Sequence, residues 1–195
     1  MLGKLRKYIN ERLPKTVGKA FSSVGFTPNR ATLLGLLFAF LSPVFAFFGL
    51  WFLVPVMIIL SGFMDIVDGA IARATGKKSR FGEYLDSLTD RVSDTLFFLA
   101  LIILGVNPYL ALIALGLSQI VSYARSKGEL LGIKMEGVGL LERSERILLL
   151  FLASIFPIFG LDLVSNVVVL VICILAAITI LQRSSAVKNK IRMEP

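Results

Sequence analysis

The sequence predicts an all-α membrane protein with six transmembrane helices and an N-terminal amphipathic juxtamembrane helix. Of its 195 residues, 56% are hydrophobic, which is more apolar surface than a soluble domain of this length can bury. Apolar stretches long enough to approach or reach spanning length recur six times along the chain. The charged residues concentrate in the links on one side of such a six-helix arrangement.

The predicted spans cover residues 31–49, 52–74, 84–104, 109–124, 147–159 and 164–181. The fifth is shorter than the roughly 20 residues that cross a bilayer, so its helix is expected to begin earlier, near Leu140. Pro28 and Asn29 predict a turn just before the first span. The whole chain, 1–195, is expected to form one domain whose six-helix bundle occupies 31–183.

Orientation follows from the basic residues. Twenty of the 21 lysines and arginines precede the first span, follow the sixth, or lie near the links after the second and fourth spans. The positive-inside rule therefore places both termini and these links on the cytoplasmic side of the cell membrane. Residues 1–22 show apolar positions at helical spacing among basic residues, which predicts a helix lying in the headgroup plane. No removable secretory signal and no nucleic-acid partner are expected.

The rare residue types narrow the chemistry. The chain has no histidine, which excludes zinc-histidine sites, Ser-His triads and imidazole acid/base catalysis. Its single cysteine, Cys173, lies in an apolar run and is expected only to pack. Carboxylates, lysines, arginines and hydroxyls must carry any reaction.

Carboxylates occur where a membrane helix should exclude them. Asp65 and Asp68 fall in the second span, and Asp86 and Asp90 fall in the third. The spacings i, i+3 and i, i+4 place each pair on one face of its helix. If the chain turns at residues 75–80, Asp68 and Asp86 each lie about 10 Å from the turn at about 1.5 Å per residue, so the two pairs meet at one depth. A further carboxylate, Asp94, follows one turn later and is given no role.

Charged groups in a bilayer are costly unless they face a cavity or a partner, so this cluster predicts a counter-ion. Oxygen ligands without nitrogen or sulfur select Mg²⁺, Mn²⁺ or Ca²⁺, and four carboxylates suit two ions. Two such ions typify phosphoryl transfer from a diphosphate. Gly69, Ala72 and Gly82 allow a ligand to approach the backbone, and Arg73 can donate to phosphate oxygens.

These residues resemble the signature of the CDP-alcohol phosphotransferases, D-x-x-D-G-x-x-A-R-x8-G-x-x-x-D-x-x-x-D, at every position. They are Asp65, Asp68, Gly69, Ala72, Arg73, Gly82, Asp86 and Asp90. The resemblance also covers the six-helix layout and the amphipathic N-terminal helix. It implies a CDP-linked lipid as donor, two Mg²⁺ or Mn²⁺ ions, CMP as product and a homodimer in the membrane.

The resemblance also assigns roles. All four aspartates are metal ligands, and Asp90 is in addition the general base that takes the proton of the acceptor hydroxyl. The cytidine pocket comprises the signature glycines and alanine with Asp68 and Arg73, together with a Pro-Asn-x-x-Thr turn that contributes Asn29 and Thr32.

The acceptor is indicated by residues 122–146, which resemble the subgroup making phosphatidylinositol phosphate or its archaeal ether-lipid counterpart. The resemblance implies that Lys134, Arg143 or Arg146, and Arg183 hold the phosphate of inositol 1-phosphate. Arginine suits this role because it binds phosphate with a bidentate fork. Glycerol 3-phosphate or another alcohol is the alternative acceptor.

Other interpretations stay open at this point. The aspartates could pair with Arg73, Arg80 and Arg91 without any metal, and cytoplasmic loops are basic in any membrane protein. An intramembrane prenyltransferase also uses aspartate-rich motifs, but it usually has more spans. A divalent-cation transporter could place carboxylates in a bundle, although transporters tend to have repeated halves with broken helices.

Overall fold

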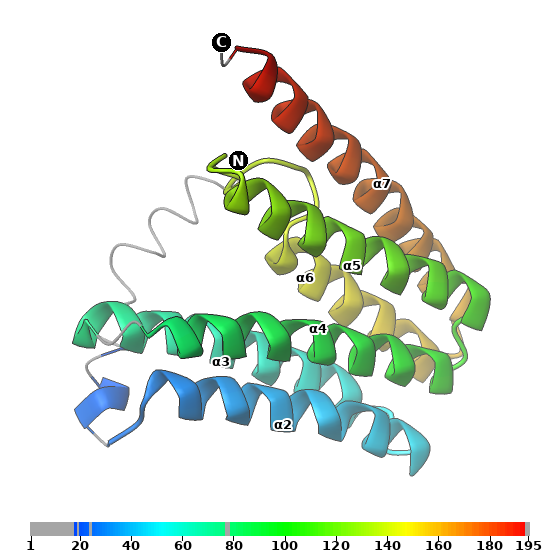
Figure 1. Ribbon diagram of the computed structural model, residues 1–195. Coiled ribbons are helices and arrows are strands. Elements are labelled where there is room, and N and C mark those ends of the chain that lie inside the picture. Colours follow the sequence, from blue (N-terminus) through cyan, green and yellow to red (C-terminus); the bar gives the residue numbers. More distant parts are fainter. Residues whose placement is uncertain (1–17, 19, 24, 77–78, 194–195) are drawn as a thin grey trace. The chain divides into compact units, whose positions relative to one another are not determined.

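The computed structural model describes residues 18, 20–23, 25–76 and 79–193, and over these ranges it contains helices and no strand (Figure 1). The helices are α2 (Pro28–Phe47), α3 (Leu53–Thr75), α4 (Arg80–Ile103), α5 (Pro108–Leu130), α6 (Arg143–Ile155) and α7 (Asp162–Met193), with a 3₁₀ turn, η1 (Phe156–Phe159), after α6. Each predicted span therefore coincides with a helix. Most of the predicted amphipathic segment, 1–22, lies outside the described residues.

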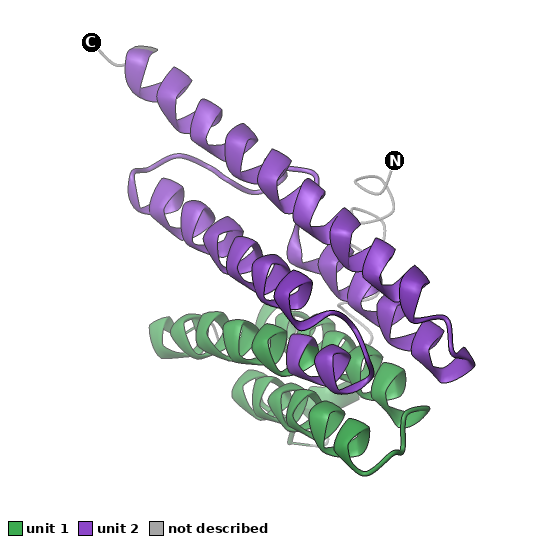
Figure 2. Ribbon diagram, turned by 90° about the vertical axis from the view of Figure 1, so that its right-hand side faces the viewer, with its two compact units in different colours: residues 1–97 green, residues 98–195 purple. Residues whose placement is uncertain are grey.

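The chain divides into two compact units, residues 1–97 and residues 98–195 (Figure 2). The boundary falls within α4. The first unit contains α2, α3 and most of α4, and the second contains α5, α6, η1 and α7.

In the first unit, α2 packs against α3 through small side chains. The buried positions of α2 include Gly35, Ala39, Ser42 and Ala46, spaced three or four residues apart. A Cβ on Gly35 would lie 3.1 Å from that of Met64 in α3, so the two helices approach closely there. Small residues at helix interfaces and large ones facing outward are typical of membrane proteins.

The outward face of α2 carries large apolar side chains. Leu33, Leu37 and Phe40, spaced i, i+4 and i+7, are about half exposed. Such an exposed apolar stripe is expected where lipid replaces water as the solvent. By length and composition, α2, α3 and residues 162–192 of α7 are long and apolar enough to cross a membrane. The chain is accordingly a membrane protein, while six crossings stay a prediction.

Residues at the helix ends explain where the elements begin. Thr27 is the N-cap of α2, its hydroxyl accepting from the Arg30 N–H, and Pro28 takes the first helical position. The helix thus starts three residues before the predicted span. The turn predicted at residues 75–80 is confirmed, since α3 ends at Thr75, Gly76 follows with φ of +66°, and α4 starts at Arg80.

In the second unit, α7 packs against both α5 and α6. Ser165 of α7 donates a 2.7 Å hydrogen bond to Ala153 O of α6. The side chain of Asn166 accepts from Asn107 N, at the start of α5, over 2.8 Å. These contacts hold the first turns of α7 to its two neighbours.

The expected start of the fifth helix near Leu140 is wrong. Helix α6 begins at Arg143, after an extended Glu142, and η1 continues it to Phe159. At about 1.5 Å per residue, the 13 residues of α6 reach about 20 Å, short of a hydrocarbon core of about 30 Å. Leu140 and Leu141 instead donate their backbone N–H groups to Thr179 of α7, which draws this stretch out of the helix.

Candidate active site

Asp68, one of the four predicted metal ligands, is held by a hydrogen bond from α2. Its side chain is buried, and the hydroxyl of Thr32 in α2 donates a 2.8 Å hydrogen bond to Asp68 Oδ2. Asp65, one turn earlier, also points toward α2, because its Oδ1 would lie 3.7 Å from a Cβ on Gly35. The close packing of α2 on α3 therefore orients this pair.

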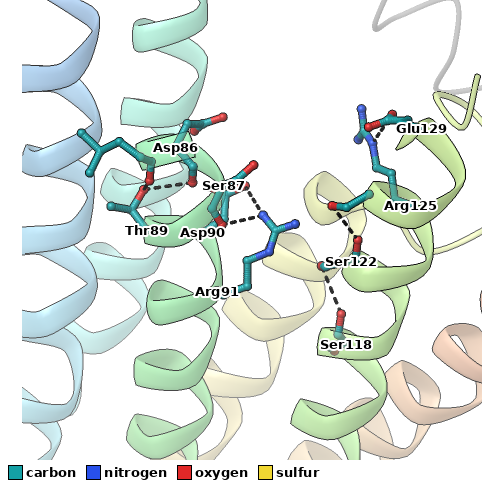
Figure 3. Close-up of polar contacts among 11 residues, drawn as sticks. Asp86, Ser87, Thr89, Asp90, Arg91, Ser118, Ser122, Arg125 and Glu129 are labelled. Atoms are coloured by element: carbon teal, nitrogen blue, oxygen red, sulfur yellow. Dashed lines mark hydrogen bonds and ion pairs between the residues drawn. The ribbon is translucent and has the colours of Figure 1, made fainter. Parts of the chain in front are cut away.

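Asp86 and Asp90 occupy successive turns of α4 (Figure 3). The negative charges of Asp86 and Asp90 both act on the carboxylate of Asp68. The structure thus brings together three of the four predicted ligands, with like charges that repel each other. A cation would relieve that repulsion.

One basic side chain, that of Arg91, lies beside Asp90 on the same helix. Arg91 Nη1 lies 4.0 Å from Asp90 Oδ2, while the same nitrogen donates a 2.6 Å hydrogen bond to Ser87 O (Figure 3). The guanidinium therefore contacts both a carboxylate and a backbone carbonyl of its own helix. Pairing of an arginine with an aspartate, the alternative to a metal, is thus present at Asp90.

The donor set fits a hard divalent cation, because carboxylate oxygens are the ligands that Mg²⁺ and Mn²⁺ prefer. Within the part of the chain that the structure describes, however, no three His, Cys, Asp or Glu side chains are close enough to form a ready-made metal site. The aspartates share one region without forming a closed chelate. We therefore expect ion binding to draw their carboxylates together.

Four of the predicted nucleotide residues lie close to one another in two pairs. A Cβ on Gly82 would lie 3.0 Å from Asn29 Oδ1, so the start of α2 faces the start of α4. A Cβ on Gly69 would lie 3.1 Å from Arg73 Nη1, which places the guanidinium beside the bare backbone of that glycine. Ala72 is partly buried on the same helix. At both glycines a polar side chain thus lies closer to the backbone than a Cβ would readily allow.

Sequence reasoning missed Ser79 in this region. Its hydroxyl accepts a 2.9 Å hydrogen bond from Gly82 N and caps the first turn of α4. A serine just before a helix is a recognisable cap signal, so this residue could have been found.

In the second unit, the predicted acceptor residues fall into two kinds. Arg146 and Arg183 are buried, with 1% and 2% of their surfaces exposed, and each acts electrostatically on the other. The side chain of Lys134 is 83% exposed and lies 3.7 Å from that of Glu136. Arg143, the first residue of α6, is partly buried.

Arg183 has clear partners. Its Nε donates to Val138 O over 2.9 Å and its Nη1 donates to Val121 O over 2.5 Å. Two of the five N–H donors of this guanidinium therefore hold backbone carbonyls. Charges of Arg125 and of the acidic Glu142 and Glu129 also act on Arg183. Arg125 and Glu129 form an ion pair of 2.9 Å on α5 (Figure 3).

Two further residues near Arg183 escaped the sequence analysis. Glu142 is buried and accepts a 2.8 Å hydrogen bond from Gly137 N. Thr179, fully buried one turn before Arg183, accepts from Leu140 N and Leu141 N. Glu142 lies within the basic segment that drew attention to Arg143, but nothing local marks Thr179.

A family model described as CDP-alcohol phosphatidyltransferase matches residues 26–181, which include all the aspartates of the first unit and most of the second unit. The chain belongs to the CDP-alcohol phosphatidyltransferase family. The resemblance noted in the sequence is thereby confirmed, and this phosphatidyltransferase is an enzyme.

Relatives and solved structures resemble the phosphatidyltransferase over most of its length. It is 35% identical to the archaetidylinositol phosphate synthase of Pyrococcus horikoshii, over 99% of this chain and 100% of the relative. It is 29% identical to the phosphatidylinositol phosphate synthase of Mycobacteroides abscessus, over 97% and 90% of the two chains.

Among solved structures, the phosphatidylinositol phosphate synthase of Mycobacterium tuberculosis, in complex with manganese and citrate, superposes with a TM-score of 0.75 at 27% identity, covering 90% of this chain and 88% of that one. The same protein with CDP-DAG bound gives a TM-score of 0.75, also at 27% identity, over 90% of this chain and 94% of that one. The agreement extends over both units of the phosphatidyltransferase.

Proposed function

We propose that this enzyme transfers the phosphatidyl or archaetidyl group of a CDP-linked lipid to a hydroxyl of inositol 1-phosphate and releases CMP. The observation that carries the proposal is the buried Asp68, held by Thr32 and influenced by the charges of Asp86 and Asp90. Carboxylates concentrated in this way suit the binding of divalent cations, which in turn would bind the diphosphate. The inositol phosphate synthases among its relatives support the acceptor.

The reaction exchanges one phosphorus–oxygen bond for another. An acceptor hydroxyl attacks the phosphorus that carries the lipid, and the bond from that phosphorus to the CMP oxygen breaks. Asp90 takes the proton of the attacking hydroxyl. Two bound divalent cations, Mg²⁺ or Mn²⁺, would neutralise the diphosphate and the leaving CMP, held by Asp65, Asp68, Asp86 and Asp90. The neighbour bound to manganese supports this ion class.

The first unit would bind the donor. Asn29 and Thr32 at the start of α2, with Gly69, Ala72 and Arg73 of α3 and Gly82 of α4, adjoin the aspartates and would receive the cytidine and its phosphates. The solved neighbour with CDP-DAG bound supports a CDP-lipid as donor.

The second unit would bind the acceptor phosphate through Lys134, Arg143, Arg146 and Arg183. The buried guanidinium groups of Arg146 and Arg183 act on each other as like charges. The negative charge of a phosphorylated acceptor would offset that repulsion, whereas free inositol or serine would not. This reasoning favours inositol 1-phosphate over an uncharged alcohol, and the relatives favour it over glycerol 3-phosphate.

The remaining expectations concern the cellular setting. The proposal includes a single domain with six membrane crossings, and termini and an active site on the cytoplasmic side. It also includes a homodimer within the membrane. The distribution of basic residues supports the orientation. Membership of the CDP-alcohol phosphatidyltransferase family argues against the transporter and the prenyltransferase.

The test is CMP release by the purified full-length protein with Mg²⁺. CDP-lipids with ester and with ether chains are each offered with inositol 1-phosphate, glycerol 3-phosphate, inositol and serine. Release that depends on inositol 1-phosphate supports the proposal. Release with glycerol 3-phosphate alone would keep the donor site and overturn the acceptor assignment.

A further inference from the structure

The segment between α5 and α6, residues 131–142, is called the connector here. It contains Lys134, one of the proposed acceptor ligands, and it has no helix of its own. Its three glycines, Gly132, Gly137 and Gly139, all have positive φ angles. A glycine-rich segment of this kind needs outside contacts to keep one shape.

Helix α7 provides those contacts through Thr179. The Thr179 hydroxyl accepts hydrogen bonds from two successive backbone groups, Leu140 N at 3.1 Å and Leu141 N at 2.9 Å, and donates its own proton to Leu175 O at 2.7 Å. The side chain is fully buried. One hydroxyl thus satisfies two backbone donors, and that of the fully buried Leu141 would otherwise be left unpaired in a dry interior.

Two further hydrogen bonds hold the connector. Arg183, one turn after Thr179 on α7, donates to Val138 O. Glu142, the last residue of the connector, accepts from Gly137 N within the same segment. At the other end, Met135 is fully buried and lies against Gly128 of α5. Lys134, next to Met135, points outward with most of its side chain exposed.

We propose that Thr179 is a positioning residue for the acceptor. By holding Leu140 and Leu141 to α7, it fixes the shape of the connector and with it the places of Lys134 and of Arg143, which begins the next helix. Thr179 touches no reacting group itself. The inference rests on the proposed function, because it assumes that the connector faces the acceptor.

The experiment compares Thr179→Val with Thr179→Ser in the full-length enzyme. Valine has nearly the same shape and no hydroxyl, whereas serine keeps the hydroxyl. Since both hydrogen bonds to the connector are lost, Thr179→Val is expected to raise the acceptor KM about tenfold, with donor KM and kcat changed less than about twofold. Thr179→Ser should restore most of the acceptor affinity.

Ser165→Ala is the matched control, because Ser165 also lies buried on α7 and bonds to α6, away from the connector. Hydrogen–deuterium exchange gives a readout besides activity. The amides of Leu140 and Leu141 should exchange faster in Thr179→Val than in the wild type, and they should keep wild-type protection in Ser165→Ala.

Three results would overturn the inference. One is an unchanged acceptor KM in Thr179→Val although Leu140 and Leu141 exchange faster. The second is an equal loss of affinity for donor and acceptor, and the third is the same loss in Ser165→Ala; either would show general loosening of the fold. All variants are assayed with the alcohol that the wild-type enzyme prefers. If that alcohol is not inositol 1-phosphate, the wild-type assay shows that the proposed acceptor is wrong, and Thr179 can still be tested with the preferred alcohol.

Discussion

The hydroxyl of Thr32 donates a 2.8 Å hydrogen bond to Oδ2 of Asp68, linking α2 to α3 in the middle of the candidate site. Thr32 also lies 3.1 Å from the carbonyl of Pro28, at the start of its own helix. Through this threonine, the turn that contains Asn29 and the first aspartate pair are coupled.

Thr32→Val should therefore weaken donor binding. A hydrogen bond to a charged group contributes about 1.5–3 kcal/mol, so the KM for CDP-lipid should rise at least about tenfold. Thr32→Ser, which keeps the hydroxyl, should stay close to the wild type. Equal kinetics for the valine and serine variants would show that the bond has no part in donor binding. CMP release at varied CDP-lipid concentration measures all three proteins.

Gly82→Ala should also impair donor binding, because the added Cβ would lie 3.0 Å from both Asn29 Oδ1 and Ser79 Oγ. The side chain of Asn29 must then move away from α4. Gly116→Ala is the control, since a Cβ there meets nothing within 4 Å. We expect the donor KM to rise several-fold in Gly82→Ala and to stay unchanged in Gly116→Ala, where alanine is the better helix former. A matching rise in both would rule out the role given to Asn29.

Asp90→Asn should abolish turnover while CDP-lipid still binds, because the amide cannot accept the hydroxyl proton. The loss should exceed about a hundredfold, the lower range for a general base. Binding of a CDP-lipid in the presence of Mg²⁺, measured by calorimetry, separates this outcome from loss of the donor site. Turnover near the wild-type rate would remove Asp90 from the role of base.

Removal of divalent cations with EDTA should stop CMP release, and either Mg²⁺ or Mn²⁺ should restore it. Because the described aspartates do not form a closed chelate, the metal should bind more tightly when CDP-lipid is present. Titration of Mn²⁺ with and without donor, followed by its paramagnetic signal, tests this coupling. Activity in EDTA equal to that with Mg²⁺ would contradict the metal-dependent mechanism.

Gly139→Ala should mimic the loss of Thr179. Gly139 has φ of +120°, and an added Cβ would collide with the methyl group of Thr179. Gly132→Ala carries similar backbone strain at φ of +77°, but its Cβ would meet nothing within 4 Å. The acceptor KM should rise more in Gly139→Ala than in Gly132→Ala. Equal values would attribute the effect to backbone strain alone.

Much of the first unit could be predicted from sequence because its contacts follow local rules. Helical spacing placed Asp65 with Asp68 and Asp86 with Asp90, and Gly76 marks the turn that brings the two helices back together. The approach of Asn29 to Gly82 was implied only by the family resemblance, since these residues are far apart in the chain.

The second unit was less predictable. Arg183 bonds to residues 45 and 62 positions away, and Thr179 bonds to residues 38 and 39 positions away. Periodicity carries no information at such distances, which is why α6 was expected to begin too early. A buried threonine in an apolar helix also resembles any other packing residue.

The bonds that hold the connector end on its main chain: the N–H groups of Gly137, Leu140 and Leu141 and the carbonyl of Val138. Main-chain groups are the same whatever side chain a residue bears. Side chains in this segment can therefore be exchanged while its path is retained, apart from the glycines, the buried Met135 and Leu141, and Glu142, whose carboxylate accepts from Gly137 N. An engineer seeking to change which alcohol is used would diversify positions 134, 136 and 138 and leave α7 untouched.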